Sequence, residues 1–161
     1  MEPRTKETIL RGLKQFSLFF GLNDEQIELI YSKGELLTLK EGDVIVDEGQ
    51  TDHNFHILLS GEMDIVLPKF NYDFERISEV KLGTKQPGDC VGEYSFIDGR
   101  PASASVIAKE DCQAFMLDRY IFKDLLDTND GLAKQVYLNM LKMLAGNIRH
   151  HDKQSDTFVL L

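Results

Sequence analysis

A short stretch of the chain, residues 88–106, contains residue types that can bind a small anion. Gly92 has no Cβ and lets the backbone come close to a ligand. A short helical turn beginning near Glu93 to Ser95 would direct its unpaired backbone N–H groups outward, where they attract a phosphate group. The spacing therefore predicts an anion-binding turn at this point of the chain.

The full stretch reads GDCVGEYSFIDGRPASASV and resembles the phosphate-binding cassette of cyclic-nucleotide-binding domains, especially that of catabolite-activator-type bacterial regulators. The family pattern is approximately G-D-x-F-G-E-x-[SA]-[LF]-x-x-x-x-P-R-[AS]-A-[TS]-V. The resemblance implies that the ligand is cAMP or cGMP and that Glu93 binds the ribose 2′-hydroxyl. It also implies a binding site formed by Val91, Gly92, Glu93, Tyr94, Ser95, Arg100, Ala102, Ser103 and Ala104.

The arginine that follows the proline in the family is replaced here by Ala102. In the family that guanidinium binds the phosphate, and charge-assisted hydrogen bonds are worth about 1.5–3 kcal/mol each. Its loss would weaken binding by about one to two decades per hydrogen bond. Ser103 is retained where related bacterial domains contact the phosphate, while Arg100 either turns into the gap or pairs with Asp98 or solvent.

Ala102 therefore leaves two hypotheses open. One is a regulatory module that senses a cyclic nucleotide and signals through its C-terminal helix to a protein partner. The other is a degenerate, ligand-free scaffold that acts as a protein interaction module. In neither case does the sequence name the effector protein.

The resemblance extends well beyond the cassette, over about Phe16 to Leu126. Alone, the cassette would also fit a Gly- and Pro-rich turn that binds nothing. The longer match includes an entry segment, the first strands and a glycine-spaced strand pair, which are residues 16–22, 37–45, 48–49 and 55–65.

The β elements can be predicted without the family. Residues 55–59 and 63–67 alternate in steps of two, which is typical of half-buried strands, and Ser60-Gly61-Glu62 between them is a tight-turn signal. A last strand is expected over 113–117, and residues 68–78 are expected to form a surface loop. Many short strands separated by glycines indicate a sandwich or jelly roll.

Helices are expected on both sides of the strands. Lys6 to Leu13 and a helix capped by Asn23 with Gln26 precede them, and Arg119 to Leu126 and Gly131 to about His150 follow. The last helix carries two adjoining apolar stripes. The first consists of Leu132, Val136, Met140 and Met143, and the second of Tyr137, Leu141, Leu144 and Ile148.

The second stripe has the 4-3-4 spacing of a coiled-coil seam, so we predict a homodimer through the helix 131–150. The alternative is that both stripes pack on the same domain. A monomer in analytical ultracentrifugation at micromolar concentration would exclude the dimer.

The predicted fold is mainly β with flanking helices, a double-stranded β-helix (jelly-roll) barrel with a long C-terminal helix. The 161 residues are expected to form one domain. Its parts are a helical entry at 5–34, a β-roll at 35–118, C-terminal helices at 119–151 and a short tail at 152–161. The apolar end, Phe158 to Leu161, either covers the barrel or docks on a partner.

The net charge of −9 and pI near 4.9 argue against a nucleic-acid surface. No helix-turn-helix follows the closing helix, so direct DNA binding is not expected. No apolar run reaches the roughly 20 residues of a membrane span, and no signal peptide is apparent, so we expect a cytoplasmic chain. Cys90 and Cys112 are expected to be reduced thiols rather than a disulfide.

Catalysis is not expected. Jelly rolls also house metal-dependent enzymes, which need several histidines and a carboxylate converging inside the barrel. His53 and His56 would point to opposite faces of a strand, and His150 and His151 lie near the end of the closing helix. No nucleophile elbow is present. We therefore predict no catalytic residue, no metal and no cofactor other than the possible ligand.

Overall fold

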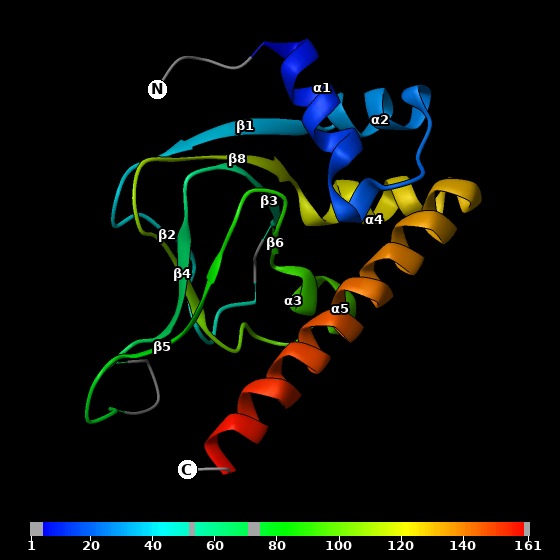
Figure 1. Ribbon diagram of the computed structural model, residues 1–161. Helices are drawn as coiled ribbons and strands as arrows, with labels where there is room; N and C mark the ends of the chain where they lie inside the picture. Colours follow the sequence, from blue (N-terminus) through cyan, green and yellow to red (C-terminus); the bar gives the residue numbers. More distant parts are fainter. Residues whose placement is uncertain (1–4, 52–53, 71–74, 160–161) are drawn as a thin grey trace.

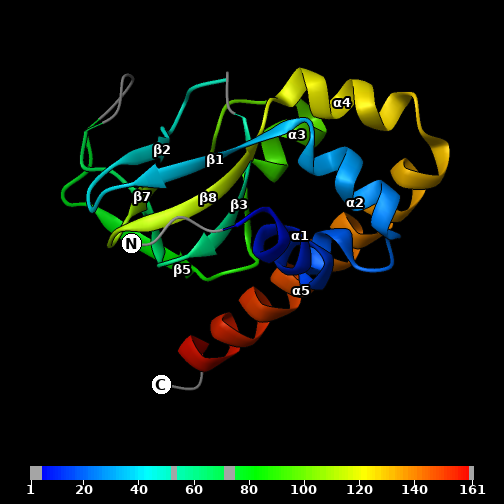
Figure 2. The same cartoon turned by 90° about the horizontal axis from the view of Figure 1, so that it is seen from above.

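Two antiparallel four-stranded sheets face each other and form the β part of the molecule, as the computed structural model shows (Figure 1). The structure describes residues 5–51, 54–70 and 75–159, with side chains up to Arg149. One sheet has the strand order β1-β8-β3-β6 and the other β2-β7-β4-β5. The sheets lie to one side of the helices (Figure 2). This arrangement confirms the predicted jelly-roll fold with flanking helices.

The strands are β1 (Gly34–Leu39), β2 (Val44–Val46), β3 (Phe55–Ser60), β4 (Met63–Leu67), β5 (Val80–Lys85), β6 (Cys90–Val91), β7 (Ser105–Ala108) and β8 (Cys112–Leu117). The helices are α1 (Lys6–Gln15), the 3-10 turn η1 (Ser17–Phe19), α2 (Asp24–Tyr31), α3 (Glu93–Asp98), α4 (Arg119–Asp127) and α5 (Asp130–Val159). The segment 68–78 connects β4 to β5 as predicted, although residues 71–74 lie outside the described part.

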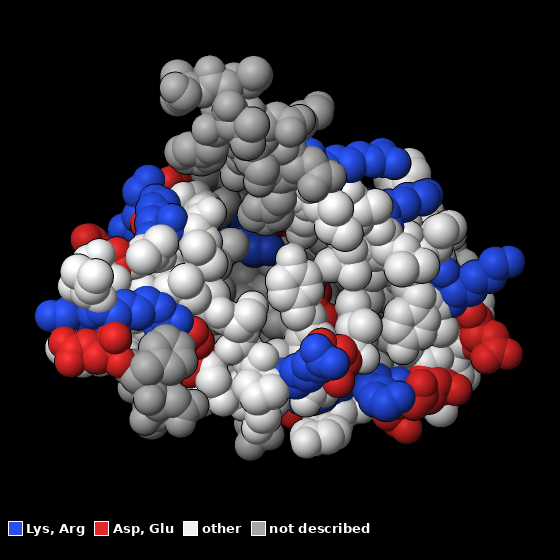
Figure 3. Space-filling view, turned by 90° about the horizontal axis from the view of Figure 1, so that it is seen from below, with Lys and Arg blue, Asp and Glu red and all other residues white. Residues whose placement is uncertain are grey.

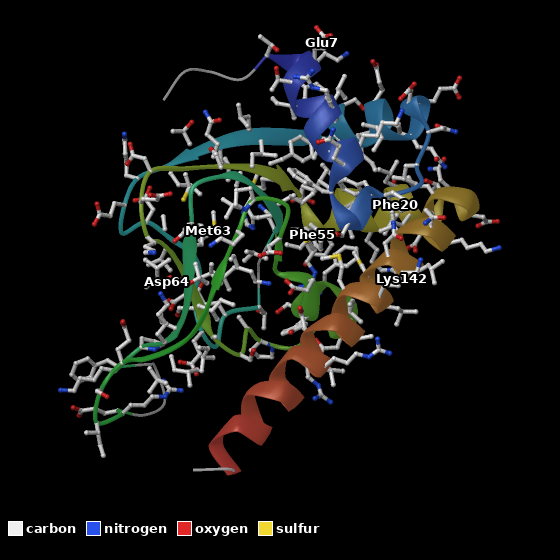
Figure 4. The ribbon with its side chains drawn as sticks, in the orientation of Figure 1. Glu7, Phe20, Phe55, Met63, Asp64 and Lys142 are labelled. Atoms are coloured by element: carbon white, nitrogen blue, oxygen red, sulfur yellow. The ribbon has the colours of Figure 1, made fainter. Side chains whose placement is uncertain are left out.

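Strand β3 is buried on both faces, whereas its alternating sequence predicted a half-buried strand. Phe55, Ile57 and Leu59 belong to an apolar cluster shared with the helices, while Leu58 belongs to a second cluster between the sheets. The period of two is therefore real, but the face expected to meet water, that of Leu58, is buried between the sheets, while the helices cover the other face. Phe55 lies between the β-roll and this helical layer (Figure 4). The centroid of its ring is 5.3 Å from the centroid of the Phe122 ring.

Helix α2 begins where its capping residues predict. The Asn23 side chain accepts a hydrogen bond from the Gln26 N–H at 2.9 Å, and the Gln26 side chain accepts one from the Asn23 N–H at 3.0 Å. This reciprocal pair fixes the start of α2. Helix α1 extends two residues beyond the predicted end, to Gln15.

Helix α5 is longer than predicted. It continues to Val159, so most of the predicted tail at 152–161 is helical. Leu132, Val136 and Met140 are buried against the domain. The second stripe is different, because Leu141 is 64% exposed and Ile148 62% exposed. The alternative that both stripes pack on the same domain therefore does not hold for Leu141 and Ile148. The tail side chains, Phe158 to Leu161, lie outside the described ones.

Both cysteines are free and buried, which agrees with the prediction of reduced thiols. Burial raises the pKa of the Cys90 thiol well above its ordinary value, so that this sulfur stays protonated.

Candidate functional site

The predicted cassette lines a pocket at one end of the β-roll. The pocket walls come from β2, β4, β5, β6, α3 and the segment leading into β7. Its lining residues are Val46, Ile65, Lys85, Val91, Gly92, Glu93, Tyr94, Ser95, Ala102, Ser103, Ala104 and Val106. Eight of the nine residues predicted from the sequence are among them, and Arg100 is the exception. Figure 3 shows the underside of the molecule, with a hollow near its centre in which a basic side chain lies below the surrounding surface.

Helix α3 begins at the pocket because Gly92 turns the backbone sharply. Gly92 has φ +89°, in the left-handed region, and a Cβ added there would lie 2.7 Å from the Asn54 backbone oxygen. The Gly92 carbonyl accepts the hydrogen bond that starts the helix, from the Phe96 N–H at 3.0 Å. The sequence therefore places glycine where both the dihedral angle and the available space exclude a side chain.

Glu93 is held in the pocket wall by Lys85, the last residue of β5. The Lys85 Nζ lies 3.2 Å from Glu93 Oε1, and the two side chains are only 16% and 11% exposed. Burial alone would lower the pKa of Lys85, but the Glu93 carboxylate outweighs it and raises that pKa above its ordinary value. Lys85 therefore stays charged inside the pocket. The sequence prediction did not include this residue.

Position 102 also lies in the wall, and its backbone is fixed. The Ala102 N–H donates to the Gln50 carbonyl at 2.9 Å, and the Gly49 N–H donates to the Ala102 carbonyl at 2.8 Å. The side chain contributes only a methyl group to the pocket. Ser103 lines the same wall, as predicted.

Arg100 does not occupy the gap left by the missing arginine. Its side chain is 83% exposed, its Nε lies 3.8 Å from Asp98 Oδ2, and it does not line the pocket. Of the alternatives left open by the sequence, pairing with Asp98 in solvent is therefore the one observed. Arg76 is half-buried and does not line the pocket, and its guanidinium donates to Glu48 at 2.7 and 2.9 Å.

A family model described as the cyclic nucleotide-binding domain matches residues 36–129. The chain belongs to this family. The match covers more than half of the chain and includes the whole pocket wall, so the resemblance noted in the sequence is confirmed.

Relatives of this cyclic nucleotide-binding domain include regulatory proteins of two kinds. The chain is 27% identical over 146 residues to a cAMP-dependent protein kinase regulatory subunit of Eremothecium gossypii, covering 88% of the chain and 29% of the relative. It is 25% identical to the catabolite activator protein of Thermus thermophilus, covering 88% of the chain and 62% of that structure, with a TM-score of 0.69. A cyclic nucleotide-binding domain from Methylobacillus flagellatus shares the fold at 23% identity and a TM-score of 0.77, over 92% of the chain and 80% of that structure. The chain thus spans less than a third of the length of the kinase subunit.

Within the described ranges, no group of three or more His, Cys, Asp or Glu side chains is placed to hold a metal ion. In the part of the chain that the structure describes, no helix combines the length and hydropathy needed to cross a bilayer.

Proposed function

We propose that this domain is a regulatory module that senses a cyclic nucleotide, cAMP or cGMP, and has no catalytic activity of its own. The observation that carries the proposal is the convergence of Gly92, Glu93, Ser95 and Ser103 on one pocket at the start of α3. In this arrangement Glu93 accepts hydrogen bonds from the ribose hydroxyl, and backbone and serine groups receive the phosphate. The remaining wall is largely apolar and suits the sugar and the base.

Calorimetric titration of the chain with cAMP and with cGMP tests this function. We expect binding by the wild type, and loss of binding on Glu93→Ala, because the buried carboxylate is the acceptor for the ribose hydroxyl. Glu62→Ala is the matched control, since Glu62 is also ion-paired, to Lys109 at 2.6 Å, but lies outside the pocket wall. Circular dichroism would show that both variants fold. Absence of heat from the wild type up to millimolar ligand would contradict the proposal.

We further propose that the signal passes to a protein partner through α5. A second cavity, between the β-roll and α5, is lined by Lys85 and Glu93 on one side and by Met140, Met143, Leu144 and Asn147 on the other. The two charged residues therefore belong to both cavities. A ligand that bonds Glu93 would alter the surface on which α5 rests, and it would favour the helix position that suits the liganded pair.

Hydrogen exchange measured by mass spectrometry would detect this coupling. We expect saturating cyclic nucleotide to change amide exchange in residues 131–149, although none of the pocket-lining residues belongs to that segment. Peptides from α1, far from the pocket wall in the chain, serve as the internal control. Identical exchange in α5 with and without ligand would show that binding is not transmitted to this helix.

We also propose that the chain forms a homodimer through the exposed stripe of α5. Tyr137 and Leu141, 38% and 64% exposed, lie on that stripe, and a second copy of the chain would remove them from water. The residue that stacks on the base would then come from α5 or from the partner's α5.

A ligand-free scaffold is the second candidate. It is favoured by Ala102 together with the positions of Arg100 and Arg76, neither of which lines the pocket. The same titration separates the two candidates, because a scaffold that has lost its ligand would give no heat with either nucleotide.

A further inference from the structure

The pocket contains one basic side chain although its expected arginine is absent. Among the described residues that line it, Lys85 is the only lysine or arginine. Arg100 is exposed beside Asp98, and Arg76 is bound to Glu48. Among the residues that the structure describes, the positive charge that a ligand meets in this pocket is therefore the ammonium of Lys85.

Lys85 is built into the wall rather than placed on the surface. It ends β5 opposite Met63 of β4, which is fully buried, and its own side chain is 16% exposed. An ammonium group carries three N–H donors, and the hydrogen bond to Glu93 at 3.2 Å uses one. Lys85 can thus keep its bond to Glu93 and donate to a ligand oxygen as well.

The spacing of the two charges matches the chemistry of a cyclic nucleotide. In 3′,5′-cyclic nucleotides the 2′-hydroxyl is on the ribose carbon next to the one that carries the phosphate ester, so the anionic phosphate oxygens lie on the side next to this hydroxyl. Glu93 offers an acceptor for the hydroxyl, and Lys85 offers a donor and a positive charge next to that acceptor, for the anionic side. A buried ammonium is stronger in this role than an exposed one because water screens it less.

We propose that Lys85 supplies, from β5, the positive charge that Ala102 cannot supply, and that it determines the preference of the site for an anionic ligand. The inference rests on the proposed function. Lys85 contacts an anionic oxygen of the bound cyclic nucleotide while it remains bonded to Glu93. The charge of the phosphate site thus comes from the strand before the cassette rather than from the residue after its proline.

Calorimetric titration of Lys85→Gln and Lys85→Arg with cAMP tests the inference. Glutamine keeps a donor for Glu93 but removes the charge, so we expect cAMP affinity to fall about ten- to hundredfold. Arginine keeps the charge, and affinity should stay within about threefold of the wild type. Lys81→Gln is the matched control on the same strand, because Lys81 pairs with Asp64 at 2.7 Å and does not line the pocket. It should bind cAMP as the wild type does.

The outcomes separate this inference from the function on which it rests. If wild-type protein binds no cyclic nucleotide, both are wrong. If it binds and Lys85→Gln binds equally well, only the role of Lys85 is wrong. Equal loss in Lys85→Gln and Lys85→Arg would mean that Lys85 acts through the shape of the wall, which also overturns the inference. Should Lys85→Gln fail to fold, the ammonium NMR signal of Lys85 in the wild type decides, since it must shift when cAMP is added.

Discussion

Gly92→Ala is expected to destabilise the domain by about 2–4 kcal/mol. At φ +89° a residue with a Cβ costs about 1–2 kcal/mol, and the new carbon would meet the Asn54 backbone oxygen at 2.7 Å. The oxygen belongs to the backbone and cannot rotate away, so the start of α3 or the entry to β3 must shift. Urea denaturation followed by circular dichroism measures the change, and cyclic nucleotide affinity should fall with it.

Gly42→Ala is the control that separates the two costs. Gly42 has nearly the same dihedral angle, φ +88°, but a Cβ there meets nothing within 4 Å. We expect this variant to lose only the conformational part, about 1–2 kcal/mol. Equal destabilisation of the two variants would show that the contact with Asn54 costs nothing, and that Gly92 is required for its dihedral angle alone.

The sequence predicts those parts of the site that depend on local chemistry. The glycine turn, the start of α3 at Glu93 and the cap of α2 each follow from residues adjacent in the chain, and all three are found. The sequence also predicts that α5 is a helix with two apolar stripes. Which of them is covered depends on packing between distant segments, and the period of the helix alone does not determine it.

Lys85 illustrates what such reasoning misses. In a regular strand Lys81 and Lys85 would share one face, so both would be expected in water. The register between β4 and β5 shifts between Ile65 and Val66, where the partner changes from Gly83 to Lys81 and Leu82 is passed over. One lysine is consequently 48% exposed and the other 16% exposed. A one-residue irregularity in the strand thus brings the ammonium of Lys85 into the pocket. No local sequence pattern predicts this irregularity.

Arg100 was included in the predicted binding site but does not line the pocket. Its closeness in sequence to the missing arginine suggested that it could turn into the gap. The turn at Asp98 prevents this, because the Asp98 carboxylate accepts a hydrogen bond from the Arg100 N–H at 2.9 Å and lies near its guanidinium. A local hydrogen bond therefore directs the side chain toward solvent.

Ala102→Arg is expected to strengthen cAMP binding at least tenfold. The backbone at this position is held by hydrogen bonds to Gly49 and Gln50, so a new side chain would start from a fixed point in the pocket wall. A guanidinium can form two parallel hydrogen bonds to a phosphate, each worth about 1.5–3 kcal/mol, less the cost of ordering the longer side chain. The gain should add to the contact proposed for Lys85, because one cation would come from β5 and the other from the segment before β7.

Ala102→Met separates charge from size in this experiment. Methionine has a similar length but no donor, and we expect it to weaken cAMP binding or leave it unchanged, because it occupies space and adds no phosphate contact. Calorimetric titration of both variants gives the comparison. If Ala102→Arg brought no gain, the explanation would have to lie in the pocket itself, since Arg100 is already committed to Asp98 and solvent. The wild-type titration then decides between two explanations. If the wild type binds cAMP, the ammonium of Lys85 already supplies the charge; if it does not, the pocket is closed to a phosphate, and the scaffold function is favoured over the sensor.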